Sequence, residues 1–221
     1  MFKIKYLIIL FFLALNTNLL ADGHVYGPFP ITLKDYSGDK TNSVKYTGQM
    51  ARHVLHDSLK ALVKTGDVSK MMAYFNGEDG LEIIAPKSKD DFIIKQTMVS
   101  EIGSGNLSGK TYKGAIAGWG NLTGPEVLEH MMTKAGEVEG GFDPNTGLDY
   151  TQLISKFAMG AVFYNQAVNN YLGKKMEIGE KPNSEPYKDG AYYTGKEHSW
   201  DEAFGYWGSA AHALTLNAEQ N

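Results

Sequence analysis

Cysteine is absent from this chain of 221 residues. Its absence excludes disulfides, thiolate metal sites, cysteine nucleophiles and a lipid anchor attached to a cysteine. Stability must therefore come from the burial of apolar side chains. A chain of this length can bury enough of them to form one domain.

Positive charge is also scarce, because 21 lysines and arginines face 25 acids and the formal net charge is −4. Nucleic acids and anionic lipids are bound by basic surfaces, so both are poor candidates as partners. A glycine-rich phosphate loop, a dinucleotide fingerprint and a Gly-x-Ser-x-Gly nucleophile motif are missing as well. We assign no catalytic residue, and an enzyme is the least favoured class.

A long apolar run is missing too, since the run at residues 7–15 is too short to span a bilayer comfortably. It follows Lys3 and Lys5 and precedes a small residue, Ala21, at the start of a polar stretch. This order is typical of a secretory signal peptide over residues 1–21. We therefore expect a periplasmic or secreted protein of the bacterial envelope, with no transmembrane segment in the mature chain.

Alternation of polar and apolar residues with a period of two is nearly absent, whereas helical spacing recurs. We expect an all-α fold, a helical bundle with long irregular loops. Residues 22–46 form an extended lead-in and residues 47–221 the helical domain. Helices are predicted at residues 47–64, 68–75, 126–134 and 148–172, and from 196 to about 216. The last helix still presents apolar residues where it stops, so we expect the natural chain to continue past Asn221.

The stretch from Leu148 to Leu172 is apolar in nearly every direction of a helical projection. A helix of this kind is buried on all sides, and its polar residues Lys156 and Asn165 argue against a membrane span. We expect it to be the central helix, with Gly160 allowing a neighbouring helix to approach closely.

The last helix carries a polar stripe formed by His198, Asp201 and Glu202. Spacings of three and four residues place these side chains on adjacent turns of one face. A histidine with a carboxylate one turn away can supply two ligands to Fe, Mn or Zn, completed by carboxylates from neighbouring helices. One divalent metal is thus a possible cofactor. The alternative interpretation is a solvated acidic face, with Trp200 and Trp207 packed on the opposite side.

Two other polar features have competing interpretations. The loop before the last helix holds Tyr187, Tyr192 and Tyr193, which suit a groove for a glycan or a peptide but would serve equally as core. His53 and His56 lie one turn apart among basic residues, and we interpret them as a solvated face of the helix at 47–64.

The run His-Ser-Trp-Asp-Glu-Ala-Phe-Gly-Tyr-Trp-Gly at residues 198–208 resembles the signature of an uncharacterised bacterial envelope family, the domain of unknown function numbered forty-eight fifty-six. The stretches at residues 46–52 and 148–168 are similar to the same family. A looser resemblance is to imelysin-like proteins, exported helical proteins linked to iron, whose motif is Gly-x-His-x-x-Glu. His198 and Asp201 match its histidine and acid.

The looser resemblance implies an iron-linked envelope role, with His198 and Asp201 at its metal site. Together with the spacing of Glu202 and the lack of catalytic motifs, it favours a non-catalytic envelope protein with a metal at His198, Asp201 and Glu202. The alternative function is a metal-free module that binds a ligand or an envelope partner through Tyr187, Tyr192 and Tyr193.

Overall fold

The structure is a computed structural model that describes residues 29–84, 96–103 and 106–208. In this part of the chain five α-helices pack together, and the only sheet has two very short strands, which confirms the all-α prediction. The α-helices are α2 (Thr47–Val63), α3 (Val68–Asn76), α4 (Gly124–Gly136), α5 (Tyr150–Ala158) and α6 (Gly195–Trp207). A π-helix, η4 (Met159–Gly173), continues α5 directly, and β1 (Phe142–Asp143) pairs antiparallel with β2 (Leu148–Asp149). Short 3-10 turns complete the fold: η1 (Val99–Glu101), η2 (Ser108–Lys110), η3 (Glu139–Gly141) and η5 (Lys174–Met176).

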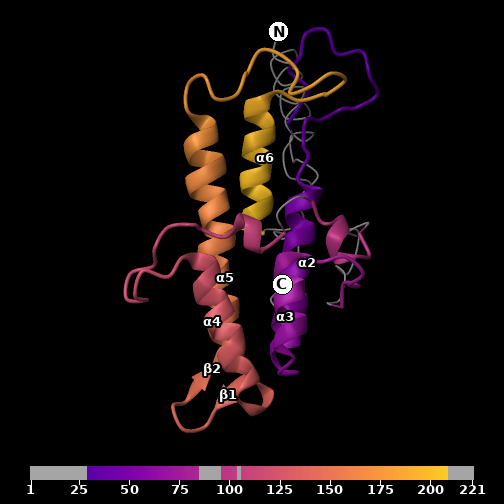
Figure 1. The fold of residues 1–221 in the computed structure, drawn as a ribbon. Coiled ribbons are helices and arrows are strands. Elements are labelled where there is room, and N and C mark those ends of the chain that lie inside the picture. The colour runs from indigo at the N-terminus through magenta and orange to yellow at the C-terminus, as the bar shows by residue number, and fades with distance from the viewer. Residues whose placement is uncertain (1–28, 85–95, 104–105, 209–221) are drawn as a thin grey trace, which may run out of the picture.

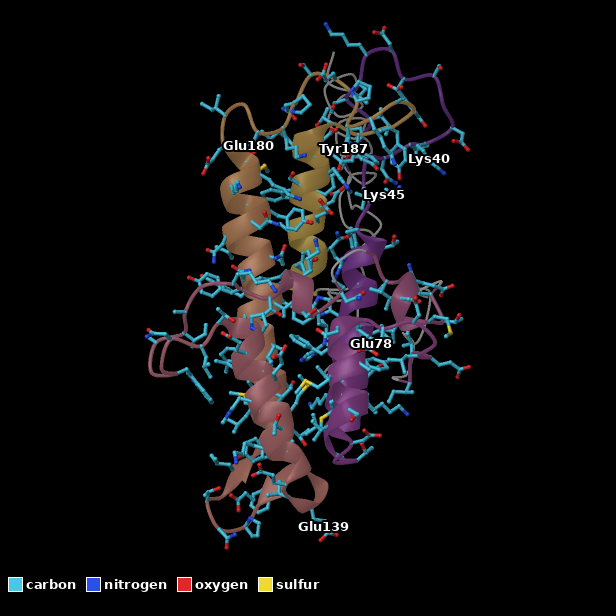
Figure 2. All side chains as sticks on the ribbon, in the orientation of Figure 1. Lys40, Lys45, Glu78, Glu139, Glu180 and Tyr187 are labelled. Atoms are coloured by element: carbon cyan, nitrogen blue, oxygen red, sulfur yellow. The ribbon has the colours of Figure 1, made fainter. Side chains whose placement is uncertain are left out.

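The helices form an elongated bundle built around the continuous rod of α5 and η4 (Figure 1). α4 packs on α5, α6 packs on η4, and α2 contacts both α5 and α6. The β1–β2 hairpin lies at one end of the molecule. The loops 29–46 and 177–194 lie at the other end, where Figure 2 shows Lys40 and Tyr187 far from Glu139. None of the helices that the structure describes has the length and apolar character needed to cross a bilayer.

Local capping signals explain where the helices begin. The Asp67 carboxylate accepts a hydrogen bond from the Lys70 N–H at 2.9 Å, and Thr123 forms a capping box with Glu126 at the start of α4. The predicted starts of α2, α3 and α6 are confirmed to within one residue, and that of α4 to within two.

The end of α6 differs from the expectation that this helix runs to about residue 216. It ends at Trp207 because Gly208 adopts a left-handed conformation with φ +84°, which favours glycine and stops the helix. The expected signal peptide, residues 1–21, and residues 209–221 lie outside the described residues.

The central rod is not buried on all sides as predicted. Met159, Tyr164 and Leu172 are exposed, and a side chain at Gly160 would meet open space. The prediction assumed α-helical spacing, but η4 is a π-helix with i→i+5 hydrogen bonds, so its residues project in other directions. The covered sides of the rod are those that face α2, α4, α6 and the segment 110–112.

A single core of buried side chains runs along the bundle, with contributions from every α-helix and from η4. The largest fully buried side chains of α2 and α3 are Leu55, Leu59, Tyr74 and Phe75. The polar side of α2 is buried as well, including His56, so the prediction of a solvated face at His53 and His56 is wrong. The reason is tertiary, because α6 and η4 both pack on the side of α2 that its sequence leaves polar.

Candidate functional site

The α6 helix is held in place at both ends. At its start, the Thr194 N–H donates to Glu197 Oε2 at 2.7 Å, and the Glu197 N–H donates to Thr194 Oγ1 at 3.2 Å. Glu197 Oε1 also accepts a hydrogen bond from the Thr32 hydroxyl at 2.9 Å. The capping box predicted from the sequence is confirmed, and its acid also ties the lead-in segment to α6.

The polar stripe of α6 faces the bundle, which contradicts the alternative interpretation of a solvated acidic face. Asp201 is only 3% exposed, whereas Trp200 and Trp207 are 49% and 70% exposed. The expected packing of these tryptophans is therefore wrong. At Gly205 a Cβ would lie 2.7 Å from the Gln49 Cβ, so α6 approaches α2 too closely for large side chains at this interface. The tryptophans consequently lie on the outside.

Glu202 is the centre of a polar network between α6, α2 and the π-helix. Its Oε1 accepts hydrogen bonds from Gln49 Nε2 at 2.7 Å and from the Tyr171 hydroxyl at 3.1 Å. Its Oε2 lies 3.8 Å from Lys175 Nζ and 3.7 Å from His198 Nε2. Burial, followed by the Glu202 charge, raises the pKa of Tyr171 above its ordinary value. One oxygen of this carboxylate is thus occupied by two hydrogen bonds, and the other lies near Lys175 and His198 without a hydrogen bond to either.

His198 lies between this network and the tyrosine-rich loop. Its ring is 4.7 Å from the Tyr193 ring and 4.9 Å from the Tyr187 ring. Burial lowers the pKa of His198, Glu202 opposes that shift, and the neighbouring lysines reinforce it. The imidazole is therefore neutral near pH 7. Within the described residues its Nδ1 atom is buried without a hydrogen-bond partner.

Asp201 points toward the lead-in segment. Its Oδ2 accepts a hydrogen bond from the Lys45 backbone N–H at 2.8 Å. Burial raises the pKa of this carboxyl to about 7, and the charges of Glu197 and Glu202 act in the same direction. Asp201 thereby positions the chain where the lead-in joins α2.

The three residues of the predicted metal site lie on one stripe, but they take different partners. In the ranges 29–84, 96–103 and 106–208, no group of three or more His, Asp or Glu side chains lies close enough to hold a metal ion. The Lys45, Lys175 and Lys181 side chains all place positive charge near His198. The structure therefore brings His198 to Glu202 and directs Asp201 elsewhere.

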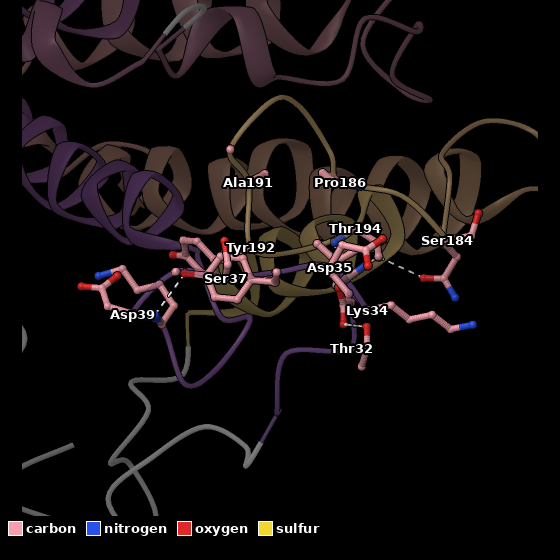
Figure 3. Close-up of a pocket in the computed structure, with 17 residues that line it drawn as sticks. Thr32, Lys34, Asp35, Ser37, Asp39, Ser184, Pro186, Ala191, Tyr192 and Thr194 are labelled. Atoms are coloured by element: carbon pink, nitrogen blue, oxygen red, sulfur yellow. Dashed lines mark hydrogen bonds between the residues drawn. The ribbon is translucent and has the colours of Figure 1, made fainter.

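The three tyrosines of the predicted ligand site have three different environments. Tyr193 is buried, and Tyr187 is 40% exposed but packs beside His198. Only Tyr192 lines a hollow, a cleft of about 1200 Å³ between the lead-in segment 32–40 and the loop 183–197. We call this hollow the loop cleft, and Figure 3 shows its lining residues.

Both walls of the loop cleft are closed loops. A bridge between Pro30 and Asn42 closes the first loop, and a bridge between Pro186 and Thr194 closes the second. The ring of Tyr36 lies 6.3 Å from the ring of Tyr192 across the cleft. The Tyr36 hydroxyl also accepts a hydrogen bond from the Lys40 N–H at 3.0 Å, which holds the first loop in shape.

The sequence interpretation missed the lead-in wall of this site. Its turn residues predicted an extended segment, and nothing in them indicates which part of the chain they face. A usable signal was the clustering of Lys34, Asp35, Asp39 and Lys40 around one aromatic residue, Tyr36.

Comparison with known proteins matches part of the chain to one family model. Residues 127–220 match the family model described as Domain of unknown function (DUF4856). The matched range includes η4, the tyrosine-rich loop and α6, but not the lead-in or α2. No curated protein and no solved structure matches the chain. These comparisons give no support to the expected similarity to imelysin-like proteins.

Proposed function

We propose that this protein is an exported, non-catalytic binding module that holds a neutral oligosaccharide in the loop cleft. The observation that carries the proposal is the cleft itself, at about 1200 Å³, with polar groups and two tyrosine rings on facing loops. Ligand sites are concave and combine apolar or aromatic surface with a few directed polar groups. The export part of the proposal depends on the signal-like residues 1–21.

The charges in the loop cleft favour a neutral ligand. Lys34 and Lys40 line the cleft together with Asp35, Asp39 and Glu197, so the two signs nearly cancel. A strongly charged ligand would meet repulsion from one of the two sets. A neutral ligand can instead bind both the lysines and the acids, since a hydroxyl group donates to a carboxylate and accepts from an ammonium group.

The uncharged lining favours a sugar in particular. Ser37, Asn183 and Ser184 line the cleft and can each donate and accept hydrogen bonds, as sugar hydroxyls do. Tyr36 and Tyr192 add aromatic surface on which the apolar face of a sugar ring can stack. An extended peptide has fewer hydroxyl groups to use this lining and is the less suited alternative.

Titration calorimetry with maltotetraose, cellotetraose and chitotetraose as probes tests the proposal. At least one should bind the wild-type protein, and Tyr192→Ala should weaken it about tenfold, since a stacked aromatic pair contributes ~0.5–1.5 kcal/mol beyond its buried area. Tyr164→Ala is the matched control, because Tyr164 is an exposed tyrosine on η4 outside the cleft. Binding of tetra-alanine but of no sugar would contradict the oligosaccharide and favour a peptide.

A second candidate function is the iron-linked metal site expected from the sequence. The observation in its favour is the neutral imidazole of His198, with an unpartnered Nδ1 and with Glu202 at 3.7 Å from Nε2. A divalent metal can be coordinated by a neutral imidazole and by a carboxylate. The surrounding lysines and the existing partners of Glu202 weigh against it, so we rank it below the loop cleft.

A further inference from the structure

A second hollow, of about 450 Å³, lies where α2, η4 and the end of α6 meet. We call it the histidine groove, because His53 and His56 line it. Its floor is apolar and buried, formed by Phe163, Ala167 and Tyr206. It shares no lining residue with the loop cleft, so the inference below is independent of the proposed function.

Large apolar side chains gather around the mouth of this groove. Met159, Tyr164 and Trp207 are 48%, 57% and 70% exposed. Leaving such surface in water is unfavourable by roughly 25 cal/mol per Å². A cluster of exposed apolar groups around one hollow is typical of a binding surface. One wall of the groove is the π-helix η4.

The histidines of the groove are held by backbone carbonyls. His53 Nε2 lies 3.0 Å from the Gly205 oxygen, and His56 Nε2 lies 3.2 Å from the Ser155 oxygen. Burial lowers the pKa of His53 to about 4, so its ring is neutral near pH 7. This ring also stacks on Phe163 with the centroids 4.2 Å apart, which extends the flat aromatic floor.

Positive charge lies at the edge of the groove. Lys60 of α2 and Lys156 of α5 line it, and neither makes an ion pair within the part of the chain that the structure describes. The lining holds a single acid, Asp57, so the two lysines outnumber it and leave the rim with a net positive charge. A ligand that enters over the apolar floor would thus meet two available cations at the rim.

We propose that the histidine groove binds an amphipathic monocarboxylate, such as a medium-chain fatty acid. Its apolar body lies on Phe163, Ala167 and Tyr206, and its carboxylate pairs with Lys60 and Lys156. The volume of the groove is within the range of about 300–1,000 Å³ found for small-molecule sites. The apolar floor provides affinity, and the lysine pair selects an anionic head group over a neutral one.

The test is titration calorimetry of the full chain with decanoate and decanol as probes, below their aggregation limits. Decanoate should bind the wild-type protein more tightly than decanol. The double variant Lys60→Gln, Lys156→Gln should weaken decanoate about fivefold and leave decanol unchanged, as expected for two exposed ion pairs. Trp207→Ala should weaken both ligands about tenfold, because it removes apolar surface from the mouth without disturbing the core.

Tyr192→Ala is the control, since it alters the loop cleft alone and should leave both affinities unchanged. The proposal is overturned if decanoate fails to bind the full chain. It is also overturned if the lysine variant weakens decanol as much as decanoate, or if sedimentation shows a dimer that Trp207→Ala dissociates. In that last case the groove is an interface between two copies.

Discussion

Asp201 shows how the environment of one side chain couples the fold to pH. In the unfolded chain an Asp carboxyl titrates near its ordinary pKa of about 3.9. In the folded protein burial raises the pKa of Asp201 to about 7. Between these pH values the folded protein keeps a proton that the unfolded chain has lost. The contribution of Asp201 to the free energy of unfolding therefore falls as the pH rises through this window.

Asp201→Asn should remove this pH dependence. The amide is always neutral, and its oxygen can still accept the hydrogen bond from the Lys45 N–H. Each pKa unit corresponds to about 1.4 kcal/mol, and because solvent screens part of the effect we expect a net gain of about 1–2 kcal/mol above pH 7. Urea unfolding of both proteins at pH 4.5 and pH 8 measures this gain in the free energy of unfolding. A variant with the same gain at both pH values would contradict the raised pKa.

At the scale of elements, the contact between α2 and α6 depends on a glycine that the sequence does not single out. A Cβ at Gly205 would lie 2.7 Å from the Gln49 Cβ and 2.9 Å from the Tyr46 Cβ. These distances leave no room for a methyl group unless the helices separate. The close approach was expected at Gly160, which instead faces open space.

Gly205→Ala should therefore destabilise the protein by about 1–3 kcal/mol, the usual cost of overpacking a tight interface. Gly48→Ala is the matched control, because a Cβ at Gly48 of α2 meets no atom within 4 Å. Alanine is the better helix former by about 1 kcal/mol, so this control should be neutral or stabilising. Thermal melting of the two variants beside the wild type measures both effects. Equal melting temperatures for Gly205→Ala and Gly48→Ala would refute the close contact between α6 and α2.

The rod formed by α5 and η4 offers a second test at this scale. Ala161 is buried, and its carbonyl oxygen accepts a hydrogen bond from the Tyr112 N–H at 2.7 Å. Ala161→Asp should place an uncompensated charge there and cost several kcal/mol, enough to unfold a domain of ordinary stability. Gly160→Asp adds the same charge one residue earlier on the exposed side and should fold normally. Similar yields and melting curves for the two variants would mean that the rod is not central.

For the whole molecule, metal content separates the two candidate functions. Protein expressed with its own residues 1–21 and purified without chelator should carry well below one Fe, Mn or Zn per chain, because lysines lie near His198 and Glu202 is already hydrogen-bonded. Elemental analysis beside His198→Ala measures this. About one metal per wild-type chain that disappears in the variant, and that falls as the pH drops below about 6, would instead establish the metal site.

Local chemistry made much of the fold predictable. The starts of α3 and α6 follow from Asp67 and from the Thr194–Glu197 capping box, whose hydrogen bonds join residues three apart. Signals of this kind need no knowledge of the rest of the chain. The shortage of strands was predictable for the same reason, because period-two alternation is also a local pattern. The end of α6 was mistaken because the helical pattern was followed past Gly208, whose left-handed conformation stops the helix.

Which face of each helix is buried could not be predicted from local sequence in the same way. Which side of α6 is buried depends on Gln49 and Tyr171, which lie 153 and 31 residues from Glu202 in the sequence and bond its carboxylate. Hydrophobic periodicity assigns polar residues to water, and it fails wherever a distant partner satisfies them inside the protein. His56 on α2 was misplaced for the same reason.

The sequence by itself thus determined the helical class, the helix starts and the tyrosine-rich loop, because each depends on neighbours along the chain. Tertiary structure alone decided that the tryptophans of α6 face outward and that Gln49 and Tyr171 bond the Glu202 carboxylate. It also decided that Tyr192 meets Tyr36, which lies in a segment more than 150 residues earlier. Packing between distant segments selects these contacts, and no short-range pattern records which segments will meet.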